Sequence, residues 1–496
     1  MAWLQDRNRP LALLFSLSLV GYGLLARWFP LLPHYSFLPQ PDVRFFAPSL
    51  ADGLLYAGLL LALFALLLWA ARLVVVRRQG LALGTILLSG LILALPLLAT
   101  FPINATDVYR YYISGRVAVV HQADPLTEPV SEFPDDPYLP LAGEWATATS
   151  PYGPLWELTA GAVTLIVGDD LLAALLLFKV LATICHLAIG GLLWLSLRGT
   201  PSGLRPALTL LWVWNPALLL TFSVNGHNDA LMLLWLASGW LLLRRGRWPL
   251  GLLVMMLGPL TKLIGLLALP LAFIECWRQL PGLAARIRLV LLTVVGGLVL
   301  AWLAFLPFGP PLTLARRLVS ESSTGGGFSP LAAFILAGRR LGFNPDVNLA
   351  VRGLLVLIAL VALWLLWRTW RGRPAARSIA DTFVAYIILA FRFRIWYAVW
   401  PFMWLVLEQG QQRVTGSNSR ARLAAGLTFL LTSQLSVIVY GQIRTELLQG
   451  SLTAAHLIGV PFTFGLPLLV GWLYQRLSAR RLLDHHRSQE EGVGRT

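Results

Sequence analysis

Long apolar stretches alternate with short polar segments along almost the whole chain. A helix needs about twenty apolar residues to cross the hydrocarbon core of a bilayer, and the chain supplies such stretches in quick succession. We therefore expect an all-α, polytopic membrane protein. The expected membrane-spanning helices lie near residues 11–29, 53–76, 81–101, 171–197, 206–223, 230–243, 289–308, 349–367, 423–440 and 454–475.

Shorter apolar runs complete the expected bundle. Runs at 248–260 and 263–276, and at 379–391 and 395–408, predict two pairs of short helices that meet near the outer surface. The run at 154–168 is expected to lie along the interface or to dip in and return. Together these runs predict a bundle of about 12–14 transmembrane helices. We expect one domain over residues 1–475 and a polar, disordered cytoplasmic tail over 476–496.

Composition and charge agree with a membrane protein and suggest its orientation. Charged residues make up 12% of the 496 residues, against about 25% in soluble domains. The formal net charge is +16, and the basic residues, mostly arginine, gather between apolar runs. Positive clusters mark cytoplasmic loops, which favours cytoplasmic termini and an outer position for the loop at 102–153. The same clustering makes nucleic-acid binding a weak interpretation.

The N-terminus and the two cysteines give little further information on fold or function. The apolar run from Leu11 to Phe29 is not followed by a small-residue cleavage pattern, so we expect a retained first helix and no removed signal peptide. Cys185 and Cys276 fall in or beside apolar segments. Two such residues provide neither a disulfide framework nor a metal-binding pattern.

The most unusual segment is Phe101 to Gly115, FPINATDVYRYYISG, at the start of the long loop. Asp107 lies only a few residues beyond an apolar run, where a carboxylate is costly to hold unless it has a role. One interpretation makes Asp107 the N-cap of a surface helix. The other makes it a catalytic carboxylate at the membrane surface.

Several short motifs resemble, in their order, the GT-C glycosyltransferases. Within that superfamily they are most similar to bacterial polyprenol-phosphate-mannose-dependent mannosyltransferases. The motifs are Asp-Val-Tyr-Arg-Tyr from Asp107, Asp-Pro-Leu from Asp124, Ser-Pro-Tyr-Gly-Pro-Leu-Trp from Ser150, Trp-Asn-Pro-Ala from Trp214, Asn-Gly-His-Asn-Asp from Asn225, Leu-Thr-Lys from Leu260, Arg-Ile-Trp-Tyr from Arg394, and Trp-Pro from Trp400. They extend from about residue 101 to 401, and the last two spans match nothing in the family.

This resemblance implies a catalytic base, which corresponds to Asp107. A sugar hydroxyl is a poor nucleophile, and a carboxylate within hydrogen-bond reach can take its proton. The implied reaction is a single displacement with inversion, in which a sugar, expected to be mannose, leaves a polyprenyl-phosphate donor for a hydroxyl of a glycolipid or lipid-linked acceptor. We expect the site at the outer face of a bacterial inner membrane. No cofactor and no nucleotide-sugar site are expected, and the ligand spacing does not support a divalent metal.

The leaving lipid phosphate needs cations that stabilise its charge. Arginine forks suit phosphate oxygens, and a lysine that faced lipid would be costly. Arg116 is interpreted differently, as a contact to lipid headgroups. The candidate phosphate-binding residues are Arg110, Lys262, Arg392 and Arg394.

A third set of residues is expected to line the sugar and acceptor site. For some of them a structural role is equally open, since Asn228 or Asp229 can cap a helix and aromatic residues are ordinary interfacial anchors. Trp400 is interpreted as such an anchor. The candidates for the sugar and acceptor site are Tyr109, Asp124, His227, Asn228, Asp229, Trp396 and Tyr397.

Two other classes of protein compete with the glycosyltransferase. A secondary transporter or lipid flippase would explain the many spans and an intramembrane Lys179, but it needs polar residues at mid-depth on several helices. A polymerase or ligase of lipid-linked glycans has a similar layout. The candidate residues gather at one membrane surface in the expected topology, which favours an enzyme. If they form one site, we expect an outward-facing cavity between the loop at 102–153 and the turns near 227, 262 and 394.

Overall fold

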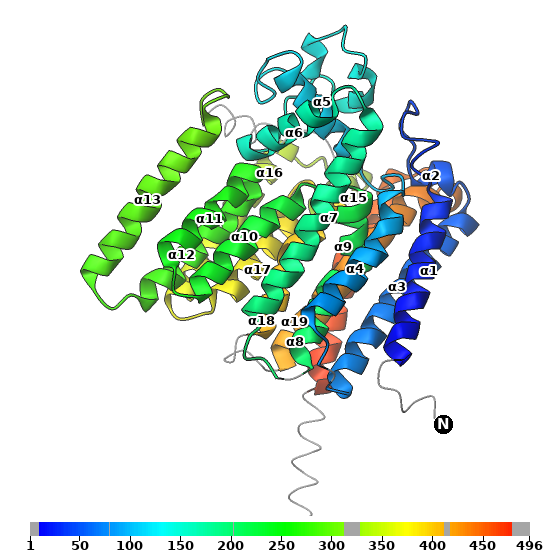
Figure 1. Ribbon diagram of the computed structural model, residues 1–496. Coiled ribbons are helices and arrows are strands. Elements are labelled where there is room, and N and C mark those ends of the chain that lie inside the picture. Colours follow the sequence, from blue (N-terminus) through cyan, green and yellow to red (C-terminus); the bar gives the residue numbers. More distant parts are fainter. Residues whose placement is uncertain (1–8, 79, 202, 312–327, 411–416, 479–496) are drawn as a thin grey trace, which may run out of the picture.

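The computed structural model describes residues 9–78, 80–201, 203–311, 328–410 and 417–478. The tail beyond residue 478, expected to be disordered, lies outside these ranges. The chain is 77% helical, and no β-strand occurs among the described residues. The helices form one bundle, with an irregular segment at one end that we call the cap, residues 101–153 (Figure 1). The prediction of an all-α polytopic membrane protein is confirmed.

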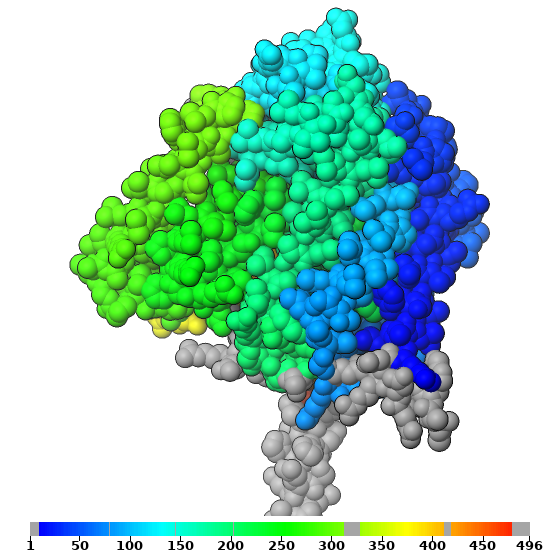
Figure 2. All heavy atoms as spheres, in the orientation of Figure 1, coloured from blue at the N-terminus to red at the C-terminus, as the bar shows by residue number. Residues whose placement is uncertain are grey.

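Eight helical segments are long and apolar enough to cross a membrane, judged over the described ranges. Many of their leucine, valine and tryptophan side chains are exposed, as expected for surfaces that face lipid. The segments are α1 (Arg9–Trp28), α3 (Leu50–Val76), α7 (Leu171–Ser196), Leu204–Val224, α13 (Leu283–Phe305), α16 (Val347–Trp370), Asn418–Leu447 and Leu452–Ser478. Figure 2 shows the cap projecting above the bundle and α13 forming one flank.

Shorter helices fill the remaining positions. The expected pairs of short helices are present: the chain breaks between α11 and α12 at Lys262, and between α17 and α18 at residues 390–394. The shorter helices are α2 (Val43–Phe46), α4 (Leu83–Leu98), α5 (Asp107–Val119), α6 (Pro154–Val167), α10 (Asp229–Arg244), α11 (Trp248–Thr261), α12 (Leu269–Gln279), α15 (Pro330–Arg340), α17 (Ala375–Leu389) and α18 (Val399–Gln409). Helix α6 packs on α5 at the cap end (Figure 1), so we treat it as interfacial.

The segment Leu204–Val224 lies at the centre of the bundle, because residues 206–224 are all buried. It bends at Asn215, where the following Pro216 disfavours helical geometry. The Asn215 side chain satisfies the freed backbone by accepting from the Ala217 N–H (3.1 Å) and donating to the Leu211 carbonyl (3.1 Å). The segment ends in a short π-helix (Leu220–Val224), and the turn after it contains Gly226, whose φ of +65° suits glycine. Residues 227–229 therefore lie at the end of the bundle that carries the cap.

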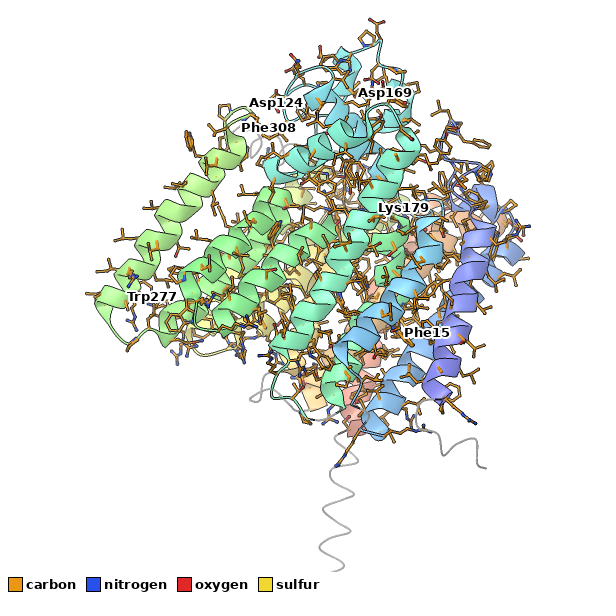
Figure 3. All side chains as sticks on the ribbon, viewed as in Figure 1. Phe15, Asp124, Asp169, Lys179, Trp277 and Phe308 are labelled. Carbon is orange, nitrogen blue, oxygen red and sulfur yellow. The ribbon has the colours of Figure 1, made fainter. Side chains whose placement is uncertain are left out.

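Lys179 has a structural role in the bundle. Its side chain is buried in α7, and Nζ donates to the carbonyls of Leu98 (2.7 Å) and Thr100 (2.5 Å). Carbonyls at the end of a helix lack partners within the helix and favour a cation. Lys179 therefore fixes the end of α4, the point from which the chain enters the cap (Figure 3).

Arg116 shows how the cap is held together. The expectation that it contacts lipid headgroups is wrong, because its side chain is only 4% exposed and pairs with Asp136 (Nε to Oδ2, 3.0 Å) and with Asp169. His121 Nε2 lies 2.7 Å from the same Asp136 carboxylate. The end of α5 faces the acidic part of its own loop, and this ion-pair group joins α5, the loop and the residues before α7.

Candidate active site

Asp107 begins helix α5, but it is not the capping residue. The N-cap is Thr106, and its side chain makes no capping hydrogen bond. The Asp107 carboxylate instead accepts a hydrogen bond from the Tyr152 hydroxyl (2.8 Å). It lines a cavity with about 390 Å³ of empty space, together with Gln40, Arg110 and Trp145. The geometry therefore favours a functional carboxylate over the capping interpretation.

The surroundings of Asp107 keep it ionised. Burial disfavours the charged form, but His227, the Tyr152 hydrogen bond, Lys262 and Arg110 together hold the pKa of the Asp107 carboxyl below its usual value. An ionised carboxylate that faces a cavity is a proton acceptor at neutral pH.

Tyr152 connects Asp107 to the turn at Lys262. The backbone N–H of Gly153 donates to the Thr261 carbonyl (3.0 Å), and a Cβ on Gly153 would lie 2.1 Å from the Leu260 carbonyl oxygen. Only glycine allows so close an approach of two backbones. Lys262 Nζ then lies 5.7 Å from the centre of the Tyr152 ring. The Ser-Pro-Tyr-Gly-Pro motif thus places the cap against the end of α11.

A second carboxylate, Asp229, lies at the start of α10 and is fully buried. Lys262 Nζ lies 2.9 Å from each of its oxygens, and the Trp400 indole N–H donates to Oδ1 (2.5 Å). The interpretation of Trp400 as an interfacial anchor is therefore wrong, since its side chain is only 2% exposed and binds this acid. Tyr397 stacks on Trp400 with ring centres 4.1 Å apart.

His227 and Asn228 carry buried polar atoms that make no hydrogen bond to the residues that the structure describes. The His227 ring stacks on Trp396 (4.2 Å between centres), and its Nδ1 lies 3.8 Å from Asp229 Oδ2. Neither ring nitrogen, nor Asn228 Nδ2, makes a hydrogen bond within the described part of the chain. Burial lowers the pKa of His227, and the nearby Asp107 and Asp229 carboxylates act in the opposite direction. Neither Asn228 nor Asp229 caps α10 with its side chain.

The four candidate phosphate-binding residues have different settings. Arg110 is half-buried, donates to the Thr149 carbonyl (2.7 Å) and stacks on Trp145 at 4.8 Å. Lys262 is enclosed by the Tyr152, Tyr397 and Trp400 rings. Arg394 is exposed above Trp396 (5.9 Å), and Arg392 is half-buried two residues before it. Lys262 and Arg394 thus lie on the Asp229 side of the site, whereas Arg110 lies within the cap.

Two of the candidate residues have structural contacts instead. The Tyr109 hydroxyl donates to the Tyr35 carbonyl (2.9 Å) from a buried position. Asp124 accepts from the N–H groups of Leu126 (2.8 Å) and Gly309 (2.9 Å), which ties the cap to the turn after α13 (Figure 3). Their side chains shape the cap and hold it on the bundle.

The cavity differs from the one expected from the sequence. Its lining comes from the start of α5 with Thr106 before it, the 3-10 segment at 141–145 and Gln40, and includes none of residues 227, 262 and 394. The rings of Tyr152, Tyr397 and Trp400 surround Lys262, with ring centres 5.7–5.9 Å from Nζ. The two regions are linked by Tyr152, whose hydroxyl contacts Asp107 and whose ring lies beside Lys262.

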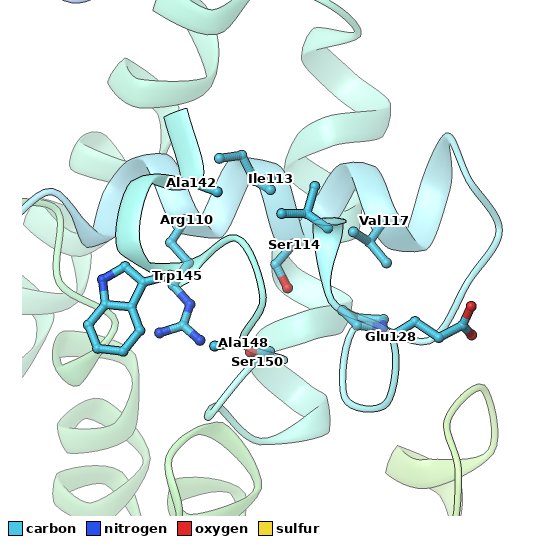
Figure 4. A pocket seen from close by; sticks show the side chains of 11 residues that line it. Arg110, Ile113, Ser114, Val117, Glu128, Ala142, Trp145, Ala148 and Ser150 are labelled. Carbon is cyan, nitrogen blue, oxygen red and sulfur yellow. The ribbon is translucent and has the colours of Figure 1, made fainter. Parts of the chain in front are cut away.

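Glu157 is a buried acid that sequence reasoning did not select. Only 1% exposed, it accepts hydrogen bonds from Ser150 Oγ (2.5 Å) and from Ser114 Oγ. Figure 4 shows both serines beside Arg110 and Trp145, around a second cavity of about 300 Å³. Tyr152 and Trp400 also belong to the site, and both stand inside motifs quoted above. Glu157, by contrast, has no sequence signal beyond being an acid in an apolar run.

We expect Glu157→Gln to stabilise the protein at neutral pH. Burial raises the pKa of Glu157 from its ordinary 4.5 to about 6. The folded state therefore holds this proton more tightly than the unfolded state, and the free-energy cost of ionising Glu157 grows from pH 4.5 to about 6 and is constant above. Glutamine avoids this cost, so the gain should reach about 2 kcal/mol at pH 7 and be small at pH 4.5. Thermal unfolding at pH 4.5 and at pH 7 measures this gain in stability. The control is Glu132→Gln, which changes an exposed glutamate.

No metal centre is evident: over the described ranges, no group of three or more His, Cys, Asp or Glu side chains could hold a metal ion. Both cysteines are buried as free thiols. The side chains of the candidate site are carboxylates, one lysine, arginines and aromatic rings.

Comparison with known proteins finds one family. A family model described as alpha-(1->6)-mannopyranosyltransferase, N-terminal domain, matches residues 12–279, more than half of the chain. Alpha-(1->6)-mannopyranosyltransferase A of Corynebacterium glutamicum is 30% identical over 181 residues, which cover 36% of each chain. Its namesake in Mycobacterium tuberculosis is 29% identical over 181 residues, 35% of this chain and 34% of the relative. A probable alpha-(1->6)-mannopyranosyltransferase of Mycolicibacterium smegmatis is 24% identical over 266 residues, 46% and 47% of the two chains. The match thus spans less than half the length of each of these relatives.

Proposed function

The chain belongs to the alpha-(1->6)-mannopyranosyltransferase family, and from that premise we propose that it moves mannose from a polyprenyl-phosphate donor to a hydroxyl of a glycolipid or lipid-linked acceptor. The reaction is a single displacement with inversion at the anomeric carbon. The observation that supports this most directly is Asp107, an ionised carboxylate in an open cavity, joined through Tyr152 to the Lys262–Asp229 pair.

Asp107 acts as general base in this proposal. Its carboxylate takes the proton of the acceptor hydroxyl while the hydroxyl oxygen bonds to the anomeric carbon. The bond between that carbon and the phosphate oxygen breaks, and its electron pair stays on the phosphate. Tyr152 holds the carboxylate in place and helps to keep it ionised before the reaction.

The donor phosphate lies on the Asp229 side of the site. Asp229 balances the charge of Lys262, whereas Arg394 is exposed and can reach a phosphate oxygen. The ring nitrogens of His227 and the Nδ2 amide group of Asn228, which make no hydrogen bond to the described residues, supply hydrogen bonds for the hydroxyls of the transferred sugar. A buried polar group without a partner is costly, and a bound sugar removes that cost.

The membrane arrangement follows from the same proposal. The polyprenyl chain stays in the bilayer against the exposed apolar helices while its head group enters the site. In this proposal both termini lie inside and the cap lies outside a bacterial inner membrane, and the positive charge of the arginine-rich turns near 244–247 and 368–377 supports that orientation.

The test is mannosyl transfer by purified protein from polyprenyl-phosphate mannose to a lipid-linked mannan acceptor. We expect transfer by the wild type, and Arg394→Gln should raise the donor KM about tenfold, since a hydrogen bond to a charged group contributes about 1.5–3 kcal/mol. Arg339→Gln, which removes an exposed arginine from α15, is the matched control. Absence of transfer with this donor, alongside transfer from a nucleotide-sugar, would contradict the proposed donor class.

A further inference from the structure

The cavity beside Asp107 is separate from the groups assigned to the donor. Asp107 and Arg110 of α5 line it together with Gln40 and Trp145. The remaining lining residues are Thr106, Leu141, Ala142 and Gly143. None of the groups that surround Asp229 contributes to its wall. This space touches the proposed base but neither Lys262 nor Arg394, so it is available to a second ligand.

Resting on the proposed transferase function, we propose that this cavity is the acceptor subsite and takes the terminal saccharide unit of a neutral glycan. Its reacting hydroxyl lies against the Asp107 carboxylate, and the ring of the saccharide lies along Trp145.

Inversion requires this arrangement. The attacking oxygen approaches the anomeric carbon from the side opposite the leaving phosphate, so the base and the phosphate-binding cations lie on opposite sides of the transferred sugar. Lys262 and Arg394 are on the Asp229 side, and Tyr152 stands between Lys262 and Asp107. The acceptor must then enter from the other side of Asp107, where the cavity lies.

The walls of the cavity suit a neutral, hydroxyl-rich ligand. Trp145 is half-buried, and Arg110 fixes its ring by stacking at 4.8 Å while the guanidinium is itself held by the Thr149 carbonyl. The Gln40 amide donates to the Leu141 carbonyl (2.7 Å), which leaves its carbonyl oxygen as an acceptor for a hydroxyl. The one carboxylate and one guanidinium in the lining offset each other, so the lining carries no excess of positive charge to attract a phosphate. An aromatic face with a few fixed polar groups is typical of small-molecule sites.

Binding of a soluble probe tests the subsite without turnover. Asp107→Asn protein, which keeps the shape of the cavity, is titrated with α-(1->6)-linked mannobiose and followed by saturation-transfer NMR. We expect binding that Trp145→Ala weakens about tenfold or more and that Trp145→Phe weakens less. If Trp145→Ala is not recovered folded, Trp145→Leu, with similar bulk and no ring face, replaces it. Trp69→Ala on α3, an exposed tryptophan in a transmembrane helix, should change nothing.

Kinetics separate this inference from the proposed function. In otherwise wild-type protein, Trp145→Ala should raise the acceptor KM about tenfold and leave the donor KM unchanged. A rise in the donor KM instead, or mannobiose binding that does not depend on Trp145, overturns the subsite while mannosyl transfer stands. If the protein binds mannobiose in a Trp145-dependent way but transfers no mannose, the saccharide subsite is supported and the proposed function is contradicted.

Discussion

Asp107→Asn is expected to lower turnover of the lipid-phosphate donor by a factor of about 100 or more. Asparagine keeps the size of the side chain and can still accept the Tyr152 hydrogen bond, but it cannot take a proton from the acceptor hydroxyl. Because the loss falls on the chemical step, kcat should fall while both KM values change little. Initial rates with saturating donor and acceptor measure it.

The matched control is Asp135→Asn, which removes an exposed acid from the same cap. It should retain wild-type turnover. The wild-type rate should also fall as pH drops through the pKa of Asp107, which its neighbours hold below the usual value, because only the ionised carboxylate is a base. Near-normal turnover of folded Asp107→Asn protein would show that Asp107 is not the general base.

The sequence predicted well those features that depend on local patterns. Helical spans follow from runs of apolar residues, and Asp107 and Lys262 stood out because charges beside apolar runs are costly. The breaks between the short helices were visible because polar residues interrupt each run. These features need no knowledge of which helices are neighbours.

Features that depend on tertiary contacts could not be predicted in the same way. In the sequence, Trp400 is indistinguishable from an interfacial tryptophan. Only the fold shows that its indole nitrogen lies 2.5 Å from Asp229 Oδ1, a residue 171 positions earlier in the chain. In the sequence, Arg116 is indistinguishable from an arginine that contacts lipid headgroups. Only the fold shows that the following loop brings Asp136 against it. The acceptor cavity depends on Gln40 and Trp145, more than a hundred residues apart, and neither belongs to a motif. Its position follows from the packing of the segment Leu139–Trp145 against α5.

The Lys262–Asp229 pair should show strong energetic coupling. Asp229 is fully buried, and the Lys262 side chain is only 14% exposed. Asp229→Asn leaves the lysine charge without its partner, and Lys262→Met leaves a buried carboxylate that retains the Trp400 hydrogen bond alone among its strong contacts. Breaking a buried pair from one side costs about 3–5 kcal/mol, so each single variant should unfold at a clearly lower temperature.

The double variant Asp229→Asn with Lys262→Met removes both charges and should recover much of the lost stability, because no unpaired charge remains buried. Thermal unfolding of the four proteins in one detergent gives the coupling. Transfer activity distinguishes the structural role from the catalytic one: the double variant should fold and yet bind the donor weakly, since it lacks the lysine beside the proposed phosphate position. If the two single effects simply add in the double variant, the pair is not coupled and Lys262 does not depend on Asp229 for its place in the site. If the double variant is stable and binds the donor as tightly as the wild type, the phosphate is held by Arg392 and Arg394 without Lys262.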